Sequence, residues 1–105
     1  MLYTELTVGT DNYKLRLNTR AIIVLEKQLG CNPIAIFGDG DTIPTISTMV
    51  SILHASLQQY QHNITLNDAY DIFDRYLDEG HTITDFLPVI VDLYKVSGLI
   101  KDVKN

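Results

Sequence analysis

Hydrophobic and polar residues alternate along the first seventeen positions, and this alternation predicts two β-strands. In residues 2–8, Leu6 and Val8 fall on one face of an extended chain, and polar residues fall on the other. Residues 13–17 repeat the pattern. The segment 9–12 between them, Gly-Thr-Asp-Asn, consists of turn formers that tolerate positive φ. We therefore predict a β-hairpin over residues 2–17.

After residue 18 the spacing of apolar residues changes from two to between three and four, which predicts helices. Asn18 or Thr19 can cap a helix that ends at Gly30, because glycine readily adopts the left-handed conformation that closes helices. A short turn opened by Asn32-Pro33 should follow. Three further helices are predicted: from beyond Pro44 to about Tyr60, from Thr65 to Gly80, and from near Thr82 or Thr84 to at least Ser97.

Together these patterns predict one α+β domain over residues 1–105, mostly α. The N-terminal β-hairpin (2–17) is followed by about four helices (19–97) and a frayed C-terminus (98–105). A lone two-stranded hairpin is only marginally stable in water. We therefore expect the hairpin to pack on the helices or to gain strands from a neighbouring subunit.

The last predicted helix differs from the others because it is apolar on nearly every side, with only Asp92 and Lys95 as a polar strip. Such a helix is either fully enclosed or lies at an interface. Since so small a domain can hardly enclose a helix, we expect an interface, although each side chain taken singly could equally fill the core of a monomer. The residues expected to contact a partner or a second copy are Tyr3, Phe86, Ile90, Leu93 and Tyr94.

Composition limits the classes of partner. The chain has 105 residues and a formal net charge of −5. This charge disfavours nucleic acids and anionic membranes, because phosphate contacts need clustered lysine and arginine. The single Cys31 excludes an internal disulfide. The N-terminus lacks the basic and apolar regions of a secretory signal, and no apolar run approaches the ~20 residues of a membrane span. We expect a cytoplasmic protein.

No catalytic, cofactor-binding or metal site is predicted. The loop that begins at Asp39 has Pro44 and Val50 at the sixth and twelfth positions, where a calcium loop needs glycine and glutamate. Carboxylates on the third predicted helix face solvent, with Arg75 placed to pair with Asp71 one turn before it. Nucleotide-binding, hydrolase and zinc-protease motifs do not occur. We therefore expect a protein that is not an enzyme.

Three motifs lie at the joints between the predicted elements: Tyr13-x-Leu15-x-Leu17, Arg20-Ala21-x-x-x-Leu25-Glu26-x-x-Leu29-Gly30 and Pro33-Ile34-Ala35-Ile36-Phe37. Together they resemble a known family, the tail assembly chaperones of long-tailed bacteriophages and prophages. The resemblance extends more loosely over the helical remainder, including the Asp85-Phe86-Leu87 segment that leads into the last helix.

This resemblance implies a non-catalytic chaperone without a cofactor. Such a protein would coat the hydrophobic tape-measure protein in the host bacterial cytoplasm, keep it soluble and help to recruit tail-tube subunits. It would form homo-oligomers and be absent from the mature virion. Two alternatives remain at this stage: a phage structural connector or minor tail subunit, and an acidic inhibitor of a basic protein. The inhibitor is disfavoured because 8 basic residues are interspersed among the 13 acidic ones.

Overall fold

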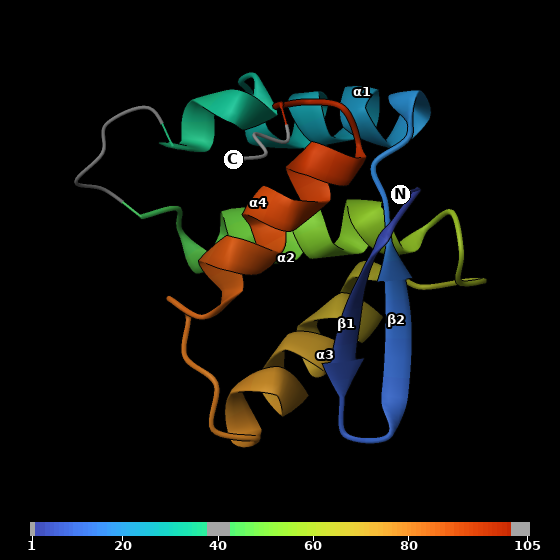
Figure 1. The fold of residues 1–105 in the computed structure, drawn as a ribbon, viewed down its shortest axis with the longest axis vertical. Helices are drawn as coiled ribbons and strands as arrows, with labels where there is room; N and C mark the ends of the chain where they lie inside the picture. Colours follow the sequence, from blue (N-terminus) through green and yellow to red (C-terminus); the bar gives the residue numbers. More distant parts are fainter. Residues whose placement is uncertain (1, 38–42, 102–105) are drawn as a thin grey trace.

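The chain forms an antiparallel hairpin followed by four α-helices and one 3₁₀ helix, as the computed structural model of residues 2–37 and 43–101 shows (Figure 1). This order confirms the predicted α+β class. The elements are β1 (Thr4–Val8), β2 (Asp11–Leu15), α1 (Thr19–Leu29), the 3₁₀ helix η1 (Pro33–Phe37), α2 (Ile46–Leu57), α3 (Leu66–Asp78) and α4 (Phe86–Val96).

The hairpin closes through a two-residue turn. Val8 lies opposite Asp11, which leaves Gly9 and Thr10 as the loop. Gly9 has a φ of 62°, as the first loop position of a type II′ turn requires. This turn sets the register so that Leu6 faces Tyr13 across the strands. One face of the hairpin is thereby directed into the core.

Side-chain caps fix the starts of three helices. The Asn18 side chain accepts a hydrogen bond from the Ala21 backbone N–H at 2.9 Å, as predicted for α1. Thr65 and Asp68 form a reciprocal capping box at the start of α3, with donor–acceptor distances of 2.8 and 3.1 Å. The bond that the Thr65 backbone N–H donates lowers the pKa of the Asp68 carboxyl. Thr45 caps α2 by a single bond, because its hydroxyl accepts from the Thr48 backbone N–H at 3.2 Å.

Helix α4 begins at Phe86, later than the predicted start near Thr82 or Thr84. Thr82 and Asp85 instead close a turn by exchanging backbone-to-side-chain hydrogen bonds of 2.8 and 3.2 Å. Pro88 is therefore the third residue of the helix, a position where its missing N–H breaks no helical hydrogen bond.

Helix α4 lies across α2, between α1 and the hairpin (Figure 1). The prediction that its apolar residues form an exposed interface is wrong. β1, α2 and η1 together enclose the helix, so its large side chains complete the core of a single chain. The four α4 residues of the predicted contact set are at most 1% exposed: Phe86, Ile90, Leu93 and Tyr94.

The chain beyond α4 is ordered further than predicted. Gly98 has a φ of 82°, and the backbone N–H groups of Gly98 and Leu99 donate to the carbonyls of Lys95 and Tyr94. This is the Schellman arrangement that closes helices. Leu99 and Ile100 then pack against the core. The predicted frayed end therefore does not begin at residue 98, and residues 102–105 lie outside the described part of the chain.

Replacing Tyr94 by phenylalanine should lower the free energy of unfolding by about 1–2 kcal/mol. The Tyr94 hydroxyl is buried and donates to the Pro33 carbonyl at 2.9 Å, so the change leaves a buried acceptor without its partner. Urea unfolding followed by circular dichroism measures the effect. The matched control is Tyr70→Phe, at a site that is 47% exposed, and should change stability little. Equal effects of the two substitutions would contradict this assignment.

Candidate interaction surface

The described residues contain no cluster of side chains that could hold a metal ion. Within residues 2–37 and 43–101, no three His, Cys, Asp or Glu side chains come together to hold a metal ion. The Asp39–Asp41 loop considered as a calcium site lies outside that part of the chain. His81 stacks on Tyr76 with ring centroids 4.3 Å apart. Burial raises the pKa of the Tyr76 hydroxyl.

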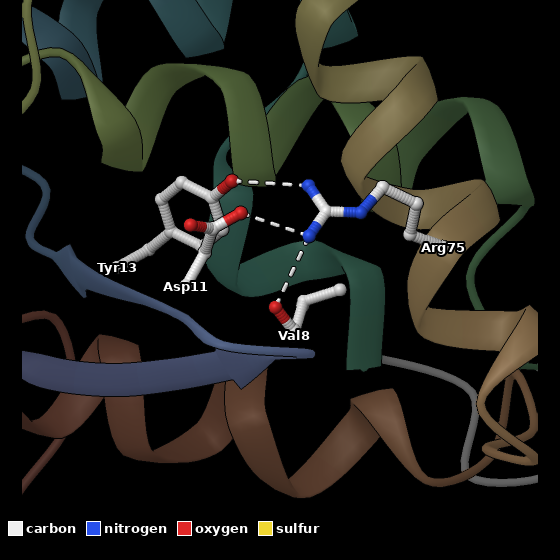
Figure 2. A network of polar contacts seen from close by, with 4 residues as sticks. All are labelled: Val8, Asp11, Tyr13 and Arg75. Carbon is white, nitrogen blue, oxygen red and sulfur yellow. Dashed lines mark hydrogen bonds and ion pairs between the residues drawn. The ribbon is translucent and has the colours of Figure 1, made fainter.

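A polar network ties the hairpin to α3 (Figure 2). The Arg75 guanidinium donates to the Asp11 carboxylate at 2.8 Å, to the Val8 carbonyl at 3.2 Å and to the Tyr13 hydroxyl at 3.5 Å. The bond to Asp11 is the main reason that the pKa of Arg75 is raised. The prediction that Arg75 pairs with Asp71 within its own helix is therefore wrong, because the hairpin turn offers three acceptors on the other side.

Tyr3 is the one residue of the predicted contact set that is not fully buried. Its ring makes an edge-on contact with Tyr60, with centroids 5.4 Å apart. The Lys14 ammonium lies 5.0 Å from the centre of the Tyr3 ring and 6.0 Å from that of Tyr60. Tyr3 therefore belongs to a local cluster that joins the hairpin to the segment after α2. It is not part of the core that surrounds α4.

Several large apolar side chains remain exposed although the core is complete. Ile23 and Val24 on α1 are 47% and 46% exposed, and Ile46 on α2 and Tyr70 on α3 are 49% and 47% exposed. The helical spacing of apolar residues predicts that Ile46 and Tyr70 belong to the buried faces of α2 and α3. The structure shows both at the edge of the core. Ile23 could have been found from the sequence, because it lies opposite Leu25 and Ala21 on a helical projection.

Two of the grooves in the described part of the chain flank α2. The groove between α1 and α2 has a volume of about 390 Å³ and is lined by amide side chains, among them Asn18, Gln58 and Gln59, together with apolar residues such as Val24. These amides already have partners, since Asn18 donates to Gln59 and Gln58 donates to the carbonyls of His54 and Ile64. Most polar groups of these amides are therefore already hydrogen-bonded within the chain.

The second groove lies between α2 and α3 and has a volume of about 320 Å³. Val50 and Phe73, each 3% exposed, form its floor, while Ile46 and Tyr70 stand beside it as half-exposed walls. Asp74 is the charged residue that lines it, with Ser47 as the other polar member. We call these six residues the α2–α3 groove. Its apolar floor and exposed walls suit contact with another apolar surface.

Comparison with known proteins gives a family but no assigned activity. The model of a family of unknown function (DUF6096) matches residues 4–105. Neither the curated proteins nor the solved structures contain a match. In the part of the chain that the structure describes, no helix is both long and apolar enough to cross a membrane.

The network at the hairpin turn should behave as a coupled unit. Arg75→Gln and Asp11→Asn should each lower the urea midpoint of unfolding, because each removes the ion pair between α3 and the turn. The double variant should lose less than the sum of the two single losses. Raising the salt concentration should shrink the effect of either change, since both side chains are about half exposed. Strictly additive losses would show that the two side chains do not interact.

Proposed function

The chain belongs to the family of unknown function DUF6096, and we propose that it is a phage tail assembly chaperone. In this role it binds the tape-measure protein, keeps it soluble and assists assembly of the tail tube, without catalysing a reaction. The proposal starts from the resemblance carried by residues 13–17, 20–30 and 33–37. In the structure these residues build β2, α1 and η1, which follow one another in the chain.

The observation that carries the proposal is the apolar surface on a domain whose core is already complete. Ile23, Val24, Ile46 and Tyr70 stay about half exposed, although twenty hydrophobic residues in the described part of the chain are buried. Exposed apolar groups that gather beside grooves mark protein-interaction sites. A protein that shields a hydrophobic client needs such a surface.

The mechanism we propose is adsorption onto the apolar segments of the client. The contacts with the client come from the exposed apolar residues of α1, α2 and α3, because the large apolar side chains of α4 are buried in the core. The net charge of −5 then opposes precipitation of the complex, because like-charged particles repel one another. Several copies bound along one long client would cover it while remaining dispersed in the host cytoplasm.

Co-expression with the tape-measure protein of the same phage or prophage tests this function. We expect the client to move from the insoluble to the soluble fraction and to co-elute with many copies of this chain on size exclusion. An unrelated acidic domain of similar size is the control for non-specific solubilisation. If the client still precipitates and this chain elutes alone, the chaperone function is wrong.

The composition of purified virions separates this function from that of a structural connector. A chaperone acts before the particle is complete, so mass spectrometry of virions should not detect this chain above background. A fixed number of copies per particle would instead identify a connector or minor tail subunit. The two measurements are independent, because solubilisation is read in the cell extract and composition is read in the finished particle.

A further inference from the structure

We propose that the α2–α3 groove is a docking site for an amphipathic helix that carries lysine or arginine beside its apolar stripe. This inference rests on the proposed function and deepens it, because it names the surface and the chemistry of the segment that the surface holds. The groove combines a buried apolar floor, two half-exposed apolar walls and a carboxylate at its edge.

The shape of the groove favours a helix as its occupant. It lies between two helices, and an amphipathic helix buries its apolar stripe in grooves of this kind by inserting side chains spaced three and four residues apart. Its volume of about 320 Å³ is at the small end of ligand pockets. The floor residues Val50 and Phe73 are apolar, so the inserted side chains should be apolar as well.

The charges around the groove favour a basic partner. Asp74 lines the groove, and Asp71 and Asp78 are exposed on the same helix within one turn of it. Arg75, the one basic residue of α3, is held by Asp11 and Val8 on the hairpin and does not neutralise this edge. Helix α2 contains neither lysine nor arginine. Neither of the two helices that form the groove therefore places a free basic side chain beside Asp74.

The same charges disfavour a second copy of this chain as the occupant. Two copies each carry a net charge of −5, so docking one on the acidic edge of the other brings like charges together. A second copy could dock there only if another of its surfaces carried the basic side chains that the acidic edge attracts. A basic amphipathic segment of a different protein satisfies both the apolar floor and the acidic edge.

Three synthetic peptides of about 20 residues, long enough to form helix in water, test the proposal. The first has a leucine stripe flanked by lysines, the second has glutamate in place of each lysine, and the third has the composition of the first without the stripe. We expect the lysine peptide to bind and to shift the backbone amide resonances of Ser47, Tyr70 and Asp74. The glutamate peptide should bind at least about fivefold more weakly, and the peptide without a stripe should not bind measurably.

Matched substitutions separate the groove from general effects of charge and apolar surface. Asp74→Lys should weaken binding of the lysine peptide by about fivefold, whereas Glu26→Lys makes the same charge change on α1 and should alter binding less than about twofold. Ile46→Ser should weaken binding, whereas Ile34→Ser removes an isoleucine of η1 that is 42% exposed and lies outside the proposed binding surface, and it should not weaken binding. Circular dichroism of each variant checks that it is folded.

Any of three results would overturn the groove assignment. The first is equal binding of the lysine and glutamate peptides, and the second is equal weakening by Asp74→Lys and Glu26→Lys. The third is resonance shifts confined to α1 or to the hairpin. Sedimentation gives a further check, because a dimer that Asp74→Lys dissociates would identify a second copy as the occupant and would likewise overturn the proposal.

Co-expression distinguishes failure of the groove from failure of the function. If the unmodified chain and the Asp74→Lys and Ile46→Ser variants all solubilise the tape-measure protein equally, the chaperone function holds and the groove assignment is wrong. If the unmodified chain fails to solubilise the client, the proposed function is wrong, and the peptide measurements still decide whether the groove binds basic helices.

Discussion

The packing of α4 against the hairpin is the constraint on which the rest of the structure depends. An isolated two-stranded hairpin and a helix that is apolar on most sides are each unfavourable in water. Packed together, each covers the surface that the other exposes. Hydrogen bonds reinforce the contact: the Arg16 guanidinium donates to the Leu2 and Val96 carbonyls, and the Leu17 backbone N–H donates to the Ser97 hydroxyl. The first and last elements of the chain therefore hold each other in place.

This packing decides which surfaces are left for a partner. With Phe86, Ile90 and Tyr94 in the core, the half-exposed apolar residues of the α-helices lie on α1, α2 and α3. The network around Arg75 has a second consequence, because it draws the cation of α3 toward the hairpin turn (Figure 2). Asp74 is then left to set the charge beside the α2–α3 groove.

Features that depend on neighbouring residues could be predicted from the sequence. The hairpin, the Asn18 and Thr65 caps and the closing Gly30 all follow from residue types within a few positions of one another. Features that depend on distant residues could not. Arg75 has a possible partner one turn away, yet it binds Asp11, which is 64 positions earlier. The burial of α4 likewise depends on a hairpin at the other end of the chain, and the grooves depend on how neighbouring helices meet.

Native-state hydrogen exchange of the α4 amides tests the central claim, that α4 is an integral part of the core of one chain. At a dilution where the protein is monomeric, the Leu93 and Tyr94 amides should be among the slowest to exchange. Their opening free energy should equal the free energy of global unfolding measured with urea. These amides could instead exchange through a local opening whose free energy is lower than that of global unfolding, while the amides of α2 and β2 stay protected. Helix α4 would then detach from a folded remainder, and that result would contradict the account.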